Sequence, residues 1–245
     1  MRKLLFSVCV LALLLPALAL GQSQKPKDVI PTAAGEVTII FLGHASLMLQ
    51  WQGKVIHIDP WSAQADYSAL PKADLVLVTH EHRDHLDMTA IDAVKKADTL
   101  FVSSLKASGL LKNPTVLKNG ESATLLGIRI DAVPAYNRVH MRSPGEPFHP
   151  KGVGNGYVLH FGATRIYVAG DTEDIPEMAA LKGVDVAFLP VNLPYTMTLD
   201  MLVEAAKLVQ PKVLYPYHTG ETEMDRAAAH LKDVPGVETR IRPMR

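Results

Sequence analysis

Short runs of apolar and β-branched residues, separated by turn residues, recur along this chain. Runs of this kind predict strands when Gly, Pro, Asn or Asp bounds them. The pair Gln52-Gly53 between two runs is typical of a hairpin turn. Strands are therefore expected at Val37–Leu42, Ser46–Gln50, Lys54–Ile58, Leu75–Thr79, Thr99–Ser103, Ser122–Leu126, Ile128–Val133, Tyr157–Phe161, Arg165–Ala169, Asp185–Leu189 and Lys212–Tyr217.

A helical period is clearest at Leu199–Val209, where apolar residues recur at i, i+3, i+4 and i+7 after the N-cap candidate Thr198. Strands come first in each half of the chain and helices follow, so this pattern alone predicts a mixed α and β domain. The other helices are expected at Met88–Lys95 after the N-cap candidate Asp87, at Leu105–Leu111 before Asn113-Pro114, and at Arg226–Leu231.

The first residues have the pattern of a secretory signal peptide. Arg2 and Lys3 precede the apolar run Leu4–Leu15, and small residues follow as far as Gly21. We expect cleavage after residue 21, a flexible stretch over residues 22–35 that contains Pro26 and Pro31, and one domain over 36–245. An uncleaved anchor is the alternative, because the apolar run is close to the shortest that spans a bilayer. The pattern predicts a periplasmic or secreted protein.

Charge and cysteine content narrow the possible partners. Lys and Arg number 25, Asp and Glu also number 25, and no run of like charge interrupts the chain. This balance argues against nucleic acid or an anionic membrane surface, and favours a small-molecule substrate. The single cysteine, Cys9, lies in the predicted leader. The mature protein would therefore have no disulfide and no thiolate ligand. Once the leader is removed, no integral membrane segment is expected. The oligomeric state stays open.

A histidine-rich stretch directly follows the apolar run Leu75–Val78 and reads H-x-H-x-D-H from His80 to His85. Imidazole and carboxylate together favour zinc and similar ions. Because side chains alternate along a strand, His80 and His82 can point the same way and share one ion. After the chain turns, Asp84 and His85 can face a second ion.

Four further motifs, each at the end of an apolar run, accompany this signature. They are Gly43-His44-Ala45-Ser46, Ile58-Asp59-Pro60-Trp61, Ala169-Gly170-Asp171-Thr172 and Tyr215-Pro216-Tyr217-His218. In this order the set resembles the metallo-β-lactamase superfamily, and within it the branch of lactonase-like and phospholipase-D-like hydrolases. The resemblance implies an α+β fold, a four-layer αββα sandwich with two sheets face to face.

The resemblance also implies a metal shell for two ions. Asp171 would bridge the ions and His218 would bind the second. Zn²⁺ is expected, while Mn²⁺ or Fe²⁺ stay possible because the same nitrogen and oxygen donors serve all three. The implied ligands are His80, His82, Asp84, His85, Asp171 and His218.

Other residues are expected around the metals. Asp59 would orient the histidine loop through hydrogen bonds, because ligating imidazoles need a partner that fixes their tautomer. His44 is a candidate for lining the site. Asp84 could accept the proton of the nucleophile, and Tyr195, which follows the run Asp185–Leu189, could stabilise a developing oxyanion.

One position departs from the resembled branch, whose members place a third histidine for the first metal in a Pro-Ala-x-His context. Here Pro134-Ala135-Tyr136 precedes Asn137, and an amide oxygen is a weaker ligand than imidazole. We expect a first metal that is loosely bound, missing, or completed by another group. His140 and His149, on the long loop 137–156, are the candidates for that group.

These residues and the resemblance together predict a metal-dependent hydrolase acting on a small ester, lactone or phosphodiester. Binding to a metal lowers the pKa of water from about 15.7 to about 7, and the resulting hydroxide would be the nucleophile. No cysteine nucleophile exists in the mature chain. Two alternatives stay open: a metal-binding protein of the same fold with weak or no hydrolytic activity, and a true β-lactamase, which export would suit.

Overall fold

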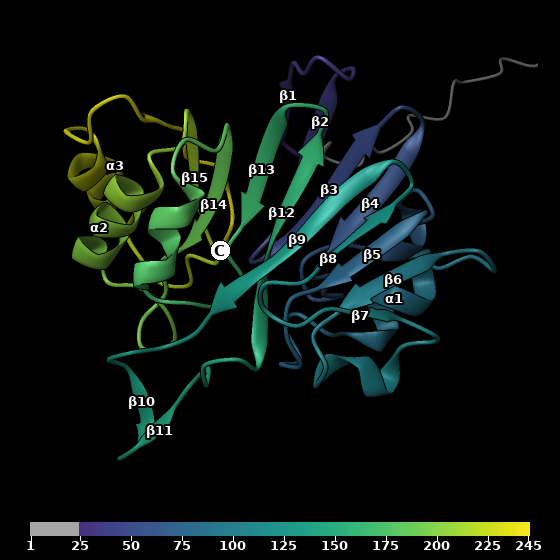
Figure 1. The fold of residues 1–245 in the computed structure, drawn as a ribbon, viewed down its shortest axis with the longest axis horizontal. Helices are drawn as coiled ribbons and strands as arrows, with labels where there is room; N and C mark the ends of the chain where they lie inside the picture. Colours follow the sequence, from purple (N-terminus) through teal and green to yellow (C-terminus); the bar gives the residue numbers. More distant parts are fainter. Residues whose placement is uncertain (1–24) are drawn as a thin grey trace, which may run out of the picture.

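Two seven-stranded sheets form the centre of the molecule, which a computed structural model describes from residue 25 to 245 (Figure 1). The predicted signal peptide, residues 1–21, lies outside the described residues. In spatial order, the first sheet comprises β1 (Lys27–Ile30), β2 (Val37–Gly43), β3 (Ser46–Trp51), β4 (Lys54–Ile58), β5 (Leu75–Val78), β6 (Leu100–Ser103) and β7 (Thr115–Val116). The second comprises β16 (Glu238–Thr239), β15 (Val213–Tyr217), β14 (Val186–Pro190), β13 (Thr164–Val168), β12 (Gly154–Phe161), β9 (Ile128–Ala135) and β8 (Ser122–Leu125).

The helices lie on the outer faces of the two sheets. The helix α1 (Met88–Val94) covers the first sheet, whereas α2 (Leu199–Val209) and α3 (Met224–Leu231) cover the second (Figure 1). Both predicted N-caps form: Asp87 accepts a hydrogen bond from the Thr89 amide and Thr198 from the Met201 amide. Short 3₁₀ helices complete the set at Tyr67–Ala69, Ala107–Leu110 and Pro176–Leu181, the second in place of the helix expected at 105–111.

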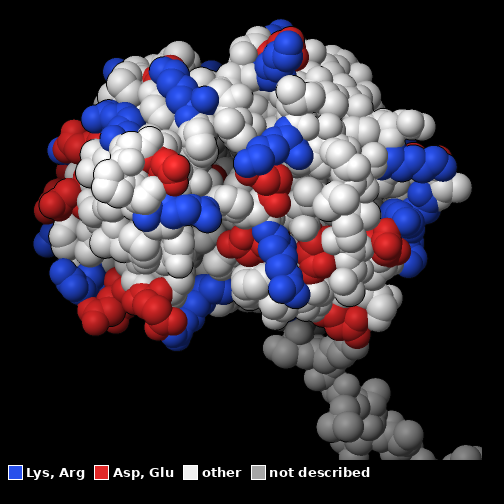
Figure 2. Space-filling model, turned by 90° about the horizontal axis from the view of Figure 1, so that it is seen from below, with Lys and Arg blue, Asp and Glu red and all other residues white. Residues whose placement is uncertain are grey.

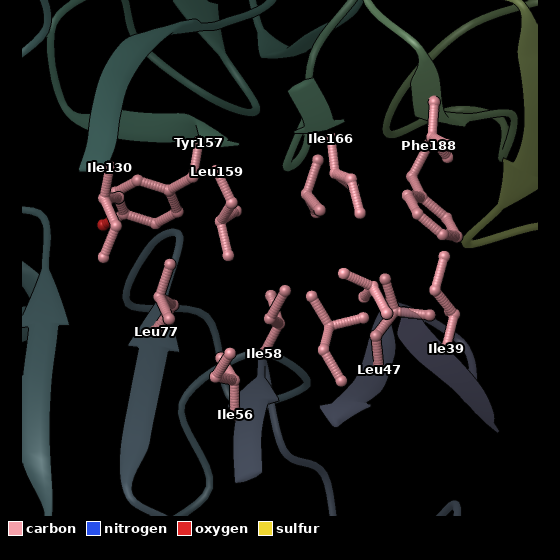
Figure 3. Packing of buried hydrophobic residues seen from close by; sticks show 14 of the residues in the cluster. Ile39, Leu47, Ile56, Ile58, Leu77, Ile130, Tyr157, Leu159, Ile166 and Phe188 are labelled. Carbon is pink, nitrogen blue, oxygen red and sulfur yellow. The ribbon is translucent and has the colours of Figure 1, made fainter. Parts of the chain in front are cut away.

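An apolar core fills the space between the sheets. Leu47 and Leu77 of the first sheet face Leu159 and Phe188 of the second (Figure 3). In β5, alternation sends Leu75 and Leu77 into this core, while Val76 and Val78 pack toward α1. A strand buried on both faces is apolar throughout, as this one is. The four-layer αββα sandwich expected from the sequence is confirmed.

Part of the stretch 22–35, which was expected to be flexible, forms a strand. Lys27–Ile30 form β1, which pairs antiparallel with β2. Asp28 accepts hydrogen bonds from Arg242 and from the Tyr215 hydroxyl, and Ile30 is buried in the core. The backbone of β1 pairs with the neighbouring β2, but the side-chain partners of Asp28 lie near the end of the chain, so the local composition gave little sign of the strand.

Parallel pairing aligns the ends of the strands that carry the site. The strands β4 and β5 run parallel in the first sheet, and β13, β14 and β15 run parallel in the second. Their carboxyl ends therefore meet at one edge of the sandwich, next to which the hairpin of β10 (Met141–Ser143) and β11 (Glu146–Pro147) projects (Figure 1). Within residues 25–245, no helix is long and apolar enough to span a bilayer.

Candidate metal centre

Loops at this edge bring the predicted histidines and carboxylates into two adjacent clusters. In each cluster, every residue offers one donor atom, and these donor atoms all lie within 4.8 Å of one another. The turn after β5 contributes to both clusters, and loops after β13 and β15 add Asp171 and His218. The first cluster consists of His80, His82, His149 and Asp171; the second consists of His44, Asp84, His85 and His218.

The first cluster contains the third histidine that the motif pattern lacks. His149 comes from the loop before β12 and places its Nε2 3.2 Å from Nδ1 of His82. The same Nε2 lies 3.2 Å from Oδ2 of Asp171, and Nε2 of His80 lies 3.9 Å from that oxygen. His149 therefore occupies the place for which it and His140 were candidates, whereas His140 pairs with Glu173 instead.

The second cluster combines a carboxylate with three imidazoles. Oδ2 of Asp84 lies 3.7 Å from Nε2 of His85 and 3.6 Å from Nε2 of His218. His44 comes from the turn between β2 and β3, and its Nε2 lies 3.0 Å from Oδ2 of Asp84. Its ring also lies against that of His218, with centroids 3.8 Å apart. His44 is thus part of the cluster rather than only near it.

Asp171 lies between the clusters. Its Oδ1 is 3.4 Å from Nε2 of His85, and its Oδ2 is 3.4 Å from Nε2 of His218. The preceding Gly170 has a left-handed backbone (φ +67°), and a Cβ there would lie 2.7 Å from the Asn155 carbonyl oxygen. This geometry requires glycine at position 170 and delivers the next carboxylate into the space shared by both clusters.

The donor atoms in these clusters fit a cation. Among the described residues, Nε2 of His80, His85 and His218 and Oδ1 of Asp171 are buried without a hydrogen-bond partner. Buried polar atoms are rarely left unpaired, and here the unpaired atoms converge. Imidazole nitrogen and carboxylate oxygen are the donors that zinc, manganese and iron accept. The donor set therefore suits two transition-metal ions.

Burial and neighbouring charges set the protonation of the clusters. Burial lowers the pKa of His80 well below its ordinary value, and His85 acts in the same direction. Burial acts to raise the pKa of Asp171, but His218 and His85 outweigh it and hold this pKa well below the ordinary value. For Asp84, the nearby imidazole of His218 and the hydrogen bond from His44 likewise outweigh burial and lower the pKa. Neutral imidazole and ionised carboxylate are the metal-binding forms of these side chains.

Asp59 lies behind the second cluster and holds one of its histidines. Its Oδ2 accepts from Nδ1 of His85 at 2.8 Å and from the Thr79 hydroxyl at 2.6 Å, while its Oδ1 accepts from the Thr79 amide at 2.8 Å. Asp59 is fully buried. A partner on Nδ1 leaves Nε2 of His85 directed at the cluster, which is the orienting geometry expected from the sequence.

Asn137 plays the corresponding part behind the first cluster. Its Oδ1 accepts from Nδ1 of His149 at 2.7 Å and from the His149 amide at 2.8 Å. Its Nδ2 donates to Oε1 of Glu173 at 3.1 Å and to the Tyr195 carbonyl at 2.9 Å. The amide of Asn137 therefore faces His149 rather than the space between the ligands, where a directly ligating side chain would point.

Glu173 is a functional candidate that the motif search missed. It is fully buried and accepts hydrogen bonds from the amides of Arg138, Val139 and His140, as well as from Asn137. These bonds fix the start of the loop that carries His149. The available signal was a third polar residue in the run Asp171-Thr172-Glu173, directly after a predicted strand.

Three residues at the site have a strained backbone. His44, Asp59 and His218 adopt positive φ angles of 54°, 45° and 48°. Such angles cost non-glycine residues about 1 kcal/mol or more, and they persist where surrounding bonds enforce them. Here the His218 amide donates to the His44 carbonyl at 2.9 Å, and the Asp59 amide donates to the Leu77 carbonyl at 3.0 Å.

A cavity of about 360 Å³ opens onto both clusters. Arg83, Arg142, Phe148, Asn192 and Tyr195 line it together with the cluster residues other than His80 and His85. Tyr195 is 45% exposed, and its ring meets that of Phe148 edge to face at 5.1 Å. Tyr195 therefore lies at the rim of the cavity, within the set of residues that a bound substrate would meet.

Comparisons with known proteins agree with this geometry. A model of the beta-lactamase superfamily domain matches residues 38–218. A UPF0173 metal-dependent hydrolase of Nanoarchaeum equitans is 31% identical over 186 residues, which cover 74% of this chain and 82% of that protein.

Solved structures extend the comparison. One from Parabacteroides distasonis, whose assignment as a metal-dependent hydrolase is itself provisional, is 47% identical with a TM-score of 0.86, covering 90% of this chain and 100% of that one. A metallo-beta-lactamase fold protein from Bacillus subtilis, 14% identical with a TM-score of 0.66 over 88% of this chain and 92% of that one, shares the fold.

Proposed function

The chain belongs to the beta-lactamase superfamily and, within it, to the UPF0173 metal-dependent hydrolases, and we propose that it hydrolyses a small ester, lactone or phosphodiester. As a member of this family it is a metal-dependent hydrolase. The observation that carries the proposed hydrolysis is the convergence of unpartnered imidazole nitrogens from both clusters on the shared carboxylate of Asp171, which suits two metal ions.

Two ions, zinc in the first instance, would be held by this chain's own clusters. His80, His82 and His149 hold one, Asp84, His85 and His218 hold the other, and Asp171 serves both. His44 lies beside the second and orients Asp84. The chemistry that divalent cations supply in such a site is activation of water and polarisation of a carbonyl or phosphoryl oxygen.

Asp84 and Tyr195 would act on the reacting groups. Asp84 is the more exposed cluster carboxylate, with 33% of its side chain accessible against 4% for Asp171. Its lowered pKa keeps it ionised, so it orients the attacking water by accepting a hydrogen bond and takes up a proton only transiently. Tyr195 can donate its phenolic proton to a developing oxyanion at the rim of the cavity.

The size of the cavity supports a small substrate. A volume of about 360 Å³ lies at the lower end of the range for small-molecule pockets. The ester, lactone and phosphodiester classes share a polarisable oxygen and a leaving oxygen, and they match the resemblance to lactonase-like and phospholipase-D-like enzymes. Membership of the superfamily does not by itself imply cleavage of β-lactams.

The test combines metal analysis with a substrate panel. Protein purified without added metal is analysed for bound elements and then loaded with zinc, manganese or iron. Each form is assayed against chromogenic esters, lactones, phosphodiesters and nitrocefin. We expect two ions per chain and turnover of at least one ester, lactone or phosphodiester that chelator abolishes. Turnover of nitrocefin alone, or binding of metal without any hydrolysis, would contradict the proposal.

We also propose that the protein is exported to the periplasm or secreted. The basic start, the apolar run and the small residues before Gln22 support this. Mass spectrometry of protein from its native host should find an N-terminus near Gln22. Recovery of the intact Met1 form from the cytoplasm would contradict export without affecting the proposed chemistry.

A further inference from the structure

We propose that the hydrolase takes substrates that carry an anionic group, a phosphate or a carboxylate, and that Arg83 and Arg142 bind this group. The proposal rests on the hydrolytic function of the same site and names its substrate class. Its evidence is the position of the two guanidinium groups, their lack of partners, and the charges that surround them.

Both arginines line the cavity that opens onto the metal clusters. Arg83 stands between His82 and Asp84 in the signature turn, so its neighbours on the two sides belong to the two clusters. Arg142 belongs to β10, in the hairpin that projects next to the site (Figure 1). Two cationic side chains from separate halves of the chain thus reach one small cavity.

Among the residues that the structure describes, neither guanidinium has a partner of opposite charge. Within residues 25–245, Arg240 and Arg242 pair with Asp28, whereas Arg83 and Arg142 form no ion pair and no side-chain hydrogen bond. The guanidinium of Arg142 instead lies 5.7 Å from the centroid of the Phe148 ring. Cation–π contact of this kind holds an arginine in place while its donors stay available.

The charges near the cavity favour an anion. Its acidic lining residues are Asp84 and Asp171, and both belong to the metal clusters. Divalent cations would more than neutralise these carboxylates and leave the two arginines as additional positive charge. Figure 2, which views the molecule from below, shows basic and acidic side chains interspersed across this face. A preference for anions would therefore arise locally, at the cavity.

The lining also suggests how the rest of the substrate packs. Arginine presents a planar fork of donors that matches the oxygens of phosphate and carboxylate. Next to Arg142, the rings of Phe148 and Tyr195 meet edge to face and offer an apolar surface. A substrate with an anionic group at the arginines and an apolar or aromatic portion against these rings would use both features.

The test measures binding of anions that cannot be hydrolysed. Phenylphosphonate and benzoate are titrated into the metal-loaded protein by calorimetry, with the wild type compared with Arg83→Gln, Arg142→Gln and the double variant. Arg129→Gln is the matched control, because it removes the same charge from a residue that does not line the cavity. Arg129 lies near the start of β9, where it pairs with Asp131. Metal content is measured for every variant.

We expect each cavity variant to bind the preferred anion about tenfold more weakly, since it loses a charged hydrogen-bond donor to the anion. Both arginines are exposed, so water screens their charges and a larger loss is not expected. The double variant should lose more than either single variant. The control should bind as the wild type does, and all should keep two ions. A larger loss for phenylphosphonate identifies a phosphate group, and a larger loss for benzoate identifies a carboxylate.

Unchanged affinity for both anions in the double variant, with its metal intact, would overturn the proposal. So would an equal loss in Arg129→Gln, which would indicate a non-specific charge effect. Failure of the proposed function would look different: the wild type would take up no metal or hydrolyse no member of the substrate panel, whatever the arginines contribute to anion binding.

Discussion

The two clusters offer the same kinds of donor atom but are built in different ways. The second takes Asp84 and His85 from the signature turn and His218 from the end of β15, all next to buried strands. The first takes His80 and His82 from the same turn but takes its third histidine, His149, from a loop 67 residues beyond His82. The geometry of the first cluster therefore depends on how that loop is held.

The groups that hold the two clusters also differ. A fully buried carboxylate, Asp59, accepts from His85, whereas a neutral amide, Asn137, accepts from His149. Hydrogen bonds to ionised acceptors are roughly twice as strong as those between neutral groups. Loops are also the parts of a protein that open at least cost in free energy. The first ion should therefore be the more weakly bound of the two.

Replacement of Asp171 should have the largest effect, because this carboxylate lies within 4 Å of imidazoles of both clusters. We expect Asp171→Ala to lose at least one equivalent of metal and to show almost no turnover. Elemental analysis and steady-state kinetics measure the two effects. Retention of two equivalents in this variant and in His82→Ala would show that the shell is assigned to the wrong residues.

Replacement of His149 should affect the first cluster alone. We expect His149→Ala to weaken the first ion by more than about a hundredfold, because losing the partner of a ligand alone costs about 10–100-fold. The matched control is His230→Ala, since His230 is exposed on α3, belongs to neither cluster and does not line the cavity. Equal metal affinity in the two variants would mean that His149 does not bind metal.

Asn137 distinguishes an orienting role from a ligating one. We expect Asn137→Ala to weaken the first ion by about 10–100-fold, because His149 loses the acceptor for its Nδ1. Asn137→His should weaken it as well, although an imidazole at this position would tighten a site that simply lacked a third histidine. Competitive titration with a chromophoric chelator separates the outcomes, and tighter binding in Asn137→His would contradict the orienting role.

Asp59 provides the matching test in the second cluster. We expect Asp59→Asn to weaken the second ion by about tenfold, since an amide oxygen still accepts from His85 but without the charge. The first ion should be unaffected. An equal effect on both ions, measured in the same titration, would show that the two clusters do not respond independently.

The smallest expected effect is the difference in metal affinity between the two clusters of the wild type, which removal of metal should reveal. As chelator is added, one ion should leave before the other, with affinities that differ by about tenfold, because the weaker ion depends on an amide-held loop histidine. Metal content measured at each chelator concentration gives two steps. Loss of both ions in one step would remove the distinction between the clusters.

Local signals explain which features were predictable from the sequence. The signature at His80–His85 follows an apolar run, so its placement after a buried strand could be inferred from neighbouring residues alone. The helix Leu199–Val209 and its N-cap Thr198 were equally local, and the structure has the same bounds.

Features that depend on distant partners could not be predicted in this way. His149 lies in a loop without periodicity, and its approach to His82 depends on bonds that Asn137 and Glu173 make across the fold. The side chain of Asp28 in β1 bonds to Arg242 and Tyr215, which follow it by about 200 residues. These side-chain contacts form only when the two sheets come together.

The most direct test of this account is a crystal structure of the zinc-loaded protein, with anomalous differences measured at the zinc absorption edge. We predict two peaks, one about 2.0–2.1 Å from ring nitrogens of His80, His82 and His149, and one surrounded by Asp84, His85 and His218. The carboxylate of Asp171 should lie between the peaks. A single peak, or a first peak from which His149 points away, would contradict the account.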